Sequence, residues 1–227
     1  GTNTGFATTD DVITLSIAAS ENLMNSGDYV FTGNISGLNF ITQTGSDDAN
    51  WSFASAVTTH PEQVVTFSIS YFDENYNPGT SVLVSTTDGS TVIVDRTAPT
   101  LSVNITSNNN VSTLAKEGDI VTLAISANET LNGPPSIVLS AEPNPTISPQ
   151  AQSSDYTATY SPTSDAGDPE QVMTFQISNV KDRAGNALST ITETTDASSV
   201  TFDYTGPVVQ TITSLSNNAI NTSRAKS

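Results

Sequence analysis

Four residues with oxygen-bearing side chains, Asp95, Glu129, Asp182 and Asn186, offer the chemistry of a divalent-cation site. Calcium takes roughly six to eight hard oxygen ligands, from carboxylates, amide or backbone carbonyls and water. Zinc does not suit the chain, because it has no Cys and one His. The alternative interpretation is that Asp182 and Asn186 form polar Asx turns and that Glu129 is solvated.

A second set of oxygen ligands precedes the first along the chain. Asp73, Asn75 and Asn77 place three such side chains at alternate positions, as the start of many calcium loops does. Gly79 comes one residue late for that pattern and no Glu follows at the twelfth position, so a plain polar turn explains the motif equally well. Glu21 joins the candidate metal ligands because it holds the same place in an internal repeat as Glu129.

The residues of the common catalytic centres are missing from this sequence. His60 is the single histidine and precedes Pro61, so we expect it to be a solvated turn residue. Without it, no Ser/His/Asp or Cys/His set can be built. Gly-rich phosphate loops are absent. Trp51 alternates with Phe53, which predicts a core residue rather than a sugar-stacking platform. We therefore predict that the chain is not an enzyme.

Charge and composition exclude two classes of partner. The 227 residues include 23 acidic and 6 basic ones, for a net charge of −17, and such a chain repels phosphate backbones. We expect no nucleic-acid partner. The longest apolar runs fall well short of the roughly 20 residues of a membrane helix, so we expect no membrane insertion in this segment.

An internal repeat organises the elements that must position these ligands. The joint at residues 94–99 returns at residues 202–207, with Asp95 and Asp203 at corresponding places 108 positions apart. The alternating apolar run at residues 13–19 likewise returns at 121–127, and residues 61–70 return at 169–178. Identity in register over this length indicates tandem duplication.

The alternation of apolar and small polar residues is the period-2 pattern of half-buried strands. About seven short strands for each repeat, with turn signals between them, predict an all-β protein made of two tandem immunoglobulin-like (Ig-like) antiparallel β-sandwiches. The predicted domains are 1–97, which would lack its first strand, and 98–206. Residues 207–227 would start a third repeat or close repeat two. The alternative is that residues 101–105 close repeat one, in which case the sequence holds two complete repeats followed by a few residues.

Two roles are open for the tail that follows Pro207. It could pack on repeat two, or it could complete a neighbouring molecule by strand addition.

A sandwich of this kind would bring the first set of ligands together. The loop after its second strand and the loop before its last strand lie at the pole where the chain enters. In repeat two these loops carry Glu129 and residues 182–186, and Asp95 belongs to the strand that enters there. We therefore expect one calcium ion near the joint.

Four motifs occur in a fixed order: Asp-x-Thr-Ala-Pro at 95–99, Gly-Asp-x-Val-Thr-Leu at 118–123, Ala-x-Glu at 127–129 and Asp-x-Ala-Gly-Asn at 182–186. In this order the chain resembles the tandem bacterial Ig-like repeats of large surface adhesins and cell-wall proteins. It departs from them at Gly206, where Ala is expected, and at residues 73–77, which replace Asp-x-Ala-Gly-Asn.

The resemblance implies stalk modules that hold a terminal binding domain away from the cell, many of which bind calcium. We thus expect an extracellular structural spacer on a bacterial surface, with neighbouring repeats, or other chains of a fibre, as partners. The alternative is a ligand-binding module for a glycan, a protein or a surface. The two copies differ most at residues 34–48 and 141–154, where the second is rich in Pro and Ser without a cluster of aromatics, which favours the spacer.

Overall fold

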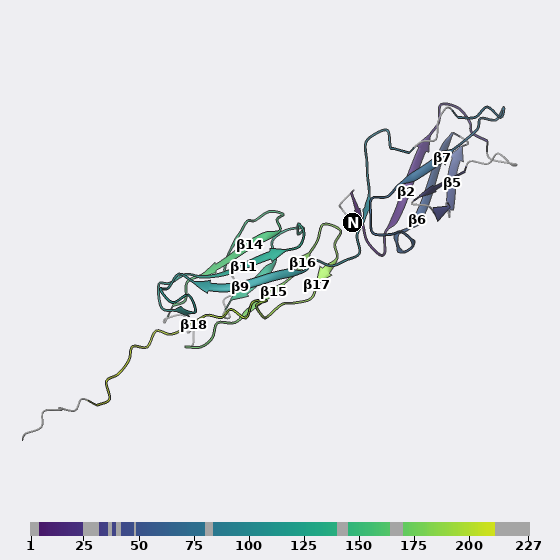
Figure 1. Cartoon of the computed structure of the whole chain (residues 1–227). Helices are drawn as coiled ribbons and strands as arrows, with labels where there is room; N and C mark the ends of the chain where they lie inside the picture. Colours follow the sequence, from purple (N-terminus) through teal and green to yellow (C-terminus); the bar gives the residue numbers. More distant parts are fainter. Residues whose placement is uncertain are drawn as a thin grey trace, which may run out of the picture.

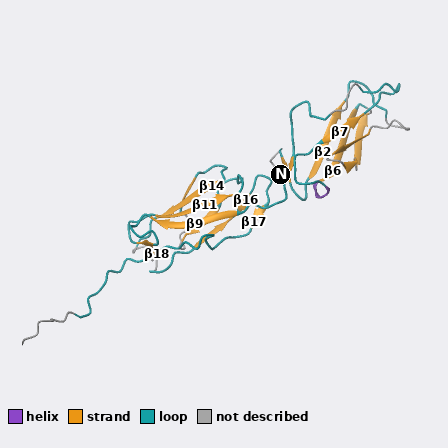
Figure 2. Cartoon of the chain, viewed as in Figure 1, coloured by secondary structure: helices purple, strands orange, loops and turns teal. Residues whose placement is uncertain are grey.

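The computed structural model describes residues 5–24, 32–35, 38–39, 42–47, 49–79, 84–139, 145–163 and 170–211. Strands make up its regular structure, and the one helical element among these residues is the short 3-10 turn Val57–Thr59 (Figures 1 and 2). None of the described helical structure has the length and apolar character needed to span a bilayer. The prediction of an all-β protein is confirmed.

Each sheet takes its strands either from β1–β8 or from β9–β18, and we call these two groups module one and module two. The first sheet of module two has the order β13-β14-β11-β9 with antiparallel pairing throughout. Its members are β13 (Thr146–Ser148), β14 (Asp155–Tyr160), β11 (Val121–Ala127) and β9 (Leu101–Ser107).

The second layer of module two is built from shorter pairings. Strand β12 (Ser136–Leu139) pairs with β15 (Phe175–Ser178), and β10 (Leu114–Ala115) runs parallel to β18 (Thr201–Phe202). A bridge between Val172 and Thr201 joins the two pairs. This arrangement of two layers, antiparallel except for the β10–β18 pair, is that of an Ig-like sandwich. The hairpin of β16 (Val180–Lys181) and β17 (Ala187–Leu188) projects at the end that faces module one (Figure 1).

The core of module two follows from the alternation in its strands. Val121, Leu123 and Ile125 of β11 are almost fully buried, whereas the residues between them are partly exposed. They pack against inward residues of the second layer such as Ile137 and Ile177. Burial on one face of each sheet is what antiparallel packing of two layers requires.

Module one repeats this plan with fewer described strands. One sheet has the order β2-β6-β5 and the other β4-β3-β7, while β1 runs parallel to β8. Their bounds are β1 (Phe6–Ala7), β2 (Val12–Ala18), β3 (Thr32–Ile35), β4 (Leu38–Asn39), β5 (Thr42–Asp47), β6 (Asn50–Ala56), β7 (Phe67–Ser70) and β8 (Ile93–Val94).

The two modules differ at the strand that follows the joint. Strand β9 pairs with β11 of module two, so residues 101–107 lie in the second sandwich rather than closing the first. Its counterpart is missing beside β2, which in the described part of the chain pairs with β6 alone. Beyond β18, residues 203–211 are exposed, and the rest of the predicted segment 207–227 lies outside the described residues. The variable segments 34–48 and 141–154 also lie partly outside them.

The interpretation of His60 as a solvated residue is wrong. Its side chain is 2% exposed and its Nε2 lies 2.8 Å from the Ser55 hydroxyl. The 3-10 turn Val57–Thr59 turns the chain inward, with the His60 amide donating to the Val57 carbonyl at 2.9 Å. Burial first, and then the Arg96 charge, lower the pKa of His60. Trp51 is 5% exposed, as the core interpretation predicted.

Candidate metal centre

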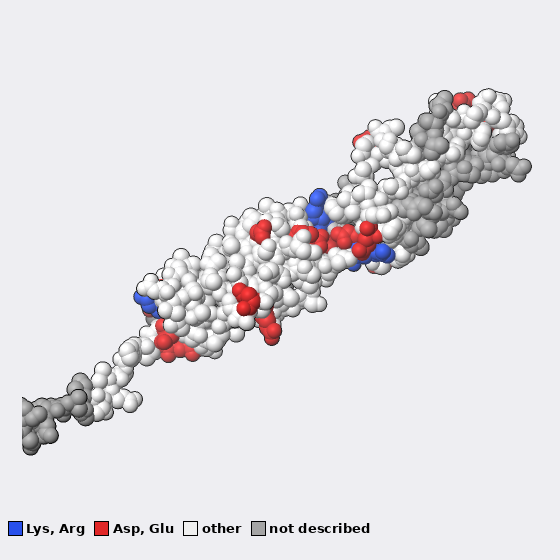
Figure 3. Space-filling model, in the orientation of Figure 1, with Lys and Arg blue, Asp and Glu red and all other residues white. Residues whose placement is uncertain are grey.

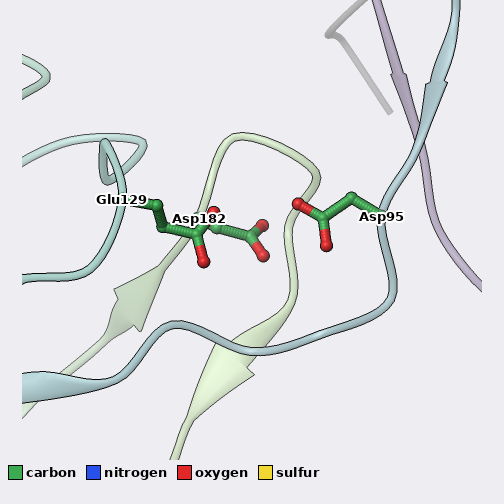
Figure 4. Close-up of side chains that lie close together, drawn as sticks. All are labelled: Asp95, Glu129 and Asp182. Carbon is green, nitrogen blue, oxygen red and sulfur yellow. The ribbon is translucent and has the colours of Figure 1, made fainter. Parts of the chain in front are cut away.

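Three carboxylates meet where the two modules join. Ligand oxygens of Asp95, Glu129 and Asp182 all lie within 4.8 Å of one another, and no other such group of three metal-ligating residues occurs among the described residues. Asp95 comes from module one, and the other two come from loops of module two (Figure 4). Acidic side chains gather at this boundary on the surface of the molecule (Figure 3).

Asp182 is the most tightly held of the three, and its side chain is fully buried. Its Oδ1 accepts the backbone N–H groups of Gly185 at 2.6 Å and Asn186 at 2.9 Å, and its Oδ2 accepts from Asn186 Nδ2 at 2.8 Å. Gly185 has a φ of 101°, a conformation that favours glycine. The 182–186 loop therefore fixes the carboxylate before any ligand arrives.

Glu129 lies in the turn directly after β11, and the residue before it fastens that turn to the linker. The Asn128 amide donates to the Thr100 carbonyl at 3.1 Å, and the Thr100 amide donates to Asn128 Oδ1 at 2.8 Å. Because the linker is the continuation of the joint, these two bonds hold Glu129 at the point where the chain enters module two.

Asp95 follows β8 at the end of module one. Its amide donates to the Ala7 carbonyl at 2.9 Å, which extends the parallel pairing of β8 with β1 by one bond. Its Oδ1 accepts the Thr97 amide at 3.1 Å, which turns the chain into the linker. The carboxylate is thus placed by module one and directed at module two.

Electrostatics disfavours three ionised carboxylates at this distance. Burial raises the pKa of Asp95, and the charges of Asp182 and Glu62 raise it further. Burial likewise raises the pKa of Glu129, together with the charges of Asp95 and Asp182. A divalent cation would remove this repulsion, because it favours the ionised form of each group. The donor set, hard oxygens from three separate segments, fits calcium.

Asn186 joins the modules through its amide group. Its Nδ2 donates to the backbone carbonyl of Asp95 at 3.0 Å, and its Oδ1 accepts from the Thr8 hydroxyl at 2.6 Å. The Arg183 guanidinium lies 4.7 Å from the ring centroid of Phe6, a cation–π distance. Asn186 therefore lies at the centre, with its oxygen directed to Thr8; its role as a metal ligand stays a prediction.

The other predicted ligands lie at the end of module one that is remote from the joint. The 73–77 loop repeats the bonding of the 182–186 loop: Asp73 Oδ1 accepts the amides of Asn75 and Asn77, both at 2.8 Å, and Oδ2 accepts from Asn77 Nδ2 at 2.6 Å. Glu21 is exposed and lines the same hollow as Asp73 and Asn77. A third carboxylate does not join them among the described residues.

Sequence reasoning missed Glu62, which braces the joint from module one. Its carboxylate accepts the Arg96 amide at 2.8 Å and the Thr97 hydroxyl at 2.9 Å. The signal was present, because Glu62 recurs as Glu170, which accepts the Tyr204 amide at 3.0 Å beside the second joint. Thr8, Phe6 and Arg183 gave no such signal.

No protein-family model matches this sequence, and no curated protein matches it. Among solved structures, the D00-D0 domain of intimin is 15% identical, with 88% of this chain and 96% of that chain covered and a TM-score of 0.29. The surface glycan-binding protein SGBP-B of the Bacteroides ovatus mixed-linkage glucan utilization locus, in complex with a mixed-linkage heptasaccharide, is 15% identical over 89% of this chain and 44% of that chain, with a TM-score of 0.24. A tandem pair of titin Ig domains is 10% identical over 88% and 91%, with a TM-score of 0.26. Scores of this size carry no functional inference, and the fold assignment rests on the strand pairing above.

Proposed function

We propose that this chain is a non-catalytic structural spacer of a bacterial extracellular adhesin or surface fibre, and that calcium at the joint makes it stiff. The observation that carries the proposal is the group of Asp95, Glu129 and Asp182, contributed by two modules and lying within 4.8 Å. The module boundaries that follow are 1–97 and 98–206. A spacer needs a defined direction from each module to the next, and an ion held by both modules supplies it.

The mechanism is mechanical. Asp95 continues β8, so an ion bound to it is fixed to the sheet of module one through the β1–β8 pairing. Asp182 and Glu129 fix the same ion to two loops of module two. Rotation about the linker would then separate ligands from the ion, so bending at the joint is opposed. Backbone carbonyls or water would supply the remaining oxygen ligands that calcium requires.

Binding also stabilises the fold. A ligand that binds the folded state alone adds about 2.7 kcal/mol to the free energy of unfolding when its concentration is about a hundred times the Kd. The 182–186 loop is already held by hydrogen bonds to Asp182, so little ordering of that loop opposes binding. The gain at Asp95 and Glu129 includes relief of their mutual repulsion.

The distribution of aromatic residues supports the spacer over the ligand-binding alternative. Trp51 is buried and stacks on Phe53 with ring centroids 6.4 Å apart, so it offers no platform to a sugar. Among the described residues, the exposed aromatic side chains are those of Tyr76 and Tyr204. They lie in different modules, and so do not form one binding face.

Thermal unfolding and small-angle scattering, each with calcium and with chelator, test the proposal. We expect calcium to raise the Tm and to narrow the distribution of end-to-end lengths. Asp182→Ala should abolish both effects, whereas Asp196→Ala, an exposed acidic residue of the same module, should keep both. An unchanged Tm and scattering profile after chelation of the wild-type chain would exclude calcium at the joint.

A further inference from the structure

His60 is a buried titratable group that takes no part in the proposed ion site. Its side chain is 2% exposed, and its Nε2 lies 2.8 Å from the hydroxyl of Ser55, a buried residue of β6. Its Nδ1 has no hydrogen-bond partner, and in the described part of the chain it is the one buried side-chain nitrogen or oxygen in this condition. Buried polar atoms in folded proteins are paired in the great majority of cases, so this nitrogen needs an explanation.

The neutral imidazole suits this place. A neutral ring has one donor nitrogen and one acceptor nitrogen, and the Ser55 hydroxyl can serve as the partner of Nε2 in either tautomer. With the hydrogen on Nε2, the unpaired Nδ1 carries only a lone pair. The fold therefore holds the uncharged ring with a single hydrogen bond.

The charged imidazolium does not suit it. Both ring nitrogens are donors in the charged form, and the N–H at Nδ1 would have no acceptor among the described residues. Burial disfavours the charged form because it separates the charge from water. Burial first, and then the positive charge of Arg96, accordingly lower the pKa of His60.

The charged groups near this turn come from three segments. Arg96 of the joint donates from Nη1 to the Thr58 carbonyl at 3.4 Å, and its Nε lies 3.6 Å from Glu62 Oε1. Asp11 contacts the turn through its backbone, while its Oδ2 accepts the Thr8 amide at 2.9 Å. In the described part of the chain, neither carboxylate is hydrogen-bonded to the imidazole, so neither compensates a proton on the ring.

The turn at residues 57–60 supports the side of the joint that belongs to module one. The Val57 amide donates to the Asp11 carbonyl at 3.1 Å, and the Asp11 carboxylate accepts the Thr8 amide. The Thr8 hydroxyl in turn donates to Asn186 Oδ1 of module two at 2.6 Å. Hydrogen bonds thus lead from the turn to the contact between the modules, and opening of the turn would remove support from that contact.

This combination of groups occurs in module one alone. The position that repeats His60, 108 residues later, is Asp168, and the position that repeats Arg96 is Tyr204. Module two therefore has neither the imidazole nor the guanidinium at these places. An effect of protonating the imidazole should act on module one and leave module two unchanged.

We propose that His60 is an acid-sensitive switch: when its buried imidazole takes up a proton, the turn at residues 57–60 opens and module one loses its hold on the joint. Opening brings the ring to water, which supplies acceptors for both N–H groups. The folded state holds fewer protons than the unfolded chain, because the pKa of His60 is lowered on folding. The stability that the neutral ring contributes is thus present above about pH 6.5 and is lost as the pH falls below it. The switch needs no ion at the joint.

Proton NMR of the full chain tests the titration directly, because the chain has one histidine and its ring signals need no further assignment. In chelator, the ring signals of the folded protein should keep their neutral positions as the pH falls from about 8 through the ordinary histidine pKa of about 6.5. A ring that titrates in the folded protein at or above that ordinary value would overturn the proposal. This measurement uses the wild type, so it decides even where a variant is unstable.

Denaturant unfolding tests the effect on module one. Trp51 is the single tryptophan and is buried in that module, so its fluorescence follows the unfolding of module one. In chelator, a fall from about pH 8 to about pH 5 should raise the unfolding equilibrium constant of the wild type several-fold relative to His60→Gln, with a limit of about thirtyfold for one histidine. Ser55→Ala keeps the imidazole and should keep this response. The same pH dependence in the wild type and in His60→Gln would contradict the switch.

Amide hydrogen exchange locates the change. After correction for the intrinsic effect of pH, protection of the Val57 and Thr8 amides should fall on acidification in the wild type and not in His60→Gln. The Leu123 amide in the core of module two should keep its protection in both proteins. An equal loss of protection at all three amides would show a general effect of acid and would refute a local switch.

Discussion

The substitution Asp95→Asn separates the ion at the joint from every other effect of calcium, and Asp203→Asn is its matched control. Each of the two residues follows a strand, and its Oδ1 accepts a hydrogen bond from the backbone amide two residues later. The distance is 3.1 Å from the Thr97 amide to Asp95 and 3.2 Å from the Thr205 amide to Asp203. Asparagine keeps that acceptor and removes one negative charge. Asp95 has two carboxylates within 4.8 Å, whereas Asp203 belongs to no such group in the described residues.

The size of the effect follows from linkage. At a calcium concentration about a hundred times the Kd, the wild type gains about 2.7 kcal/mol of unfolding free energy. If removal of one of three carboxylates weakens binding about a hundredfold, the same concentration gives Asp95→Asn about 0.4 kcal/mol. In chelator, Asp95→Asn should be more stable than the wild type, because it removes a negative charge that repels Glu129 and Asp182.

Scanning calorimetry with calcium and with chelator measures both effects. For a module of about 100 residues, a gain of 2.7 kcal/mol raises the Tm by on the order of 10 °C or more. Asp95→Asn should lose most of this rise, and Asp203→Asn should keep it. Equal losses in the two variants would refute the reasoning, since calcium would then act through general screening of the negative charge.

Three further predictions concern the same centre. The pKa values of Asp95 and Glu129 are raised, so the folded apo protein binds more protons than the unfolded chain. In chelator, the free energy of unfolding of the wild type should therefore rise relative to that of Glu129→Gln as the pH falls from 7 towards about 4. Denaturant titration measures this difference. Asn186→Ala removes bonds to both modules and should lower the free energy of unfolding by about 1–3 kcal/mol and weaken calcium binding, measured by denaturation and calorimetry. Gly185→Ala forces alanine to a φ of 101° and should destabilise module two by about 1 kcal/mol or more, whereas Gly206→Ala meets no atoms within 4 Å and should change little.

Much of the fold could be predicted because the sequence repeats its own hydrophobic pattern. Alternation identifies strands, and the 108-residue repeat assigns each strand of one module to a counterpart in the other. The general topology of an Ig-like sandwich then places Glu129 and the 182–186 loop at the entry pole. The structure does bring these carboxylates to within 4.8 Å of Asp95.

The remainder depends on geometry that periodicity does not carry. The contacts of Thr8 with Asn186 and of Arg183 with Phe6 depend on how the modules meet, and neither has a repeat counterpart. The sequence placed the 73–77 loop as the counterpart of the 182–186 loop, but it did not show that Asp73 and Asp182 accept the same kind of hydrogen bond from the residue four positions later. His60 was misjudged because a single 3-10 turn decides whether its ring faces the core.

The most direct test of the ion at the joint is a crystal structure grown in calcium, with an anomalous difference map. The account predicts one peak among Asp95, Glu129 and Asp182, at about 2.3–2.6 Å from their carboxylate oxygens. A map with no peak there, in crystals that hold calcium at the 73–77 loop or elsewhere, would contradict it.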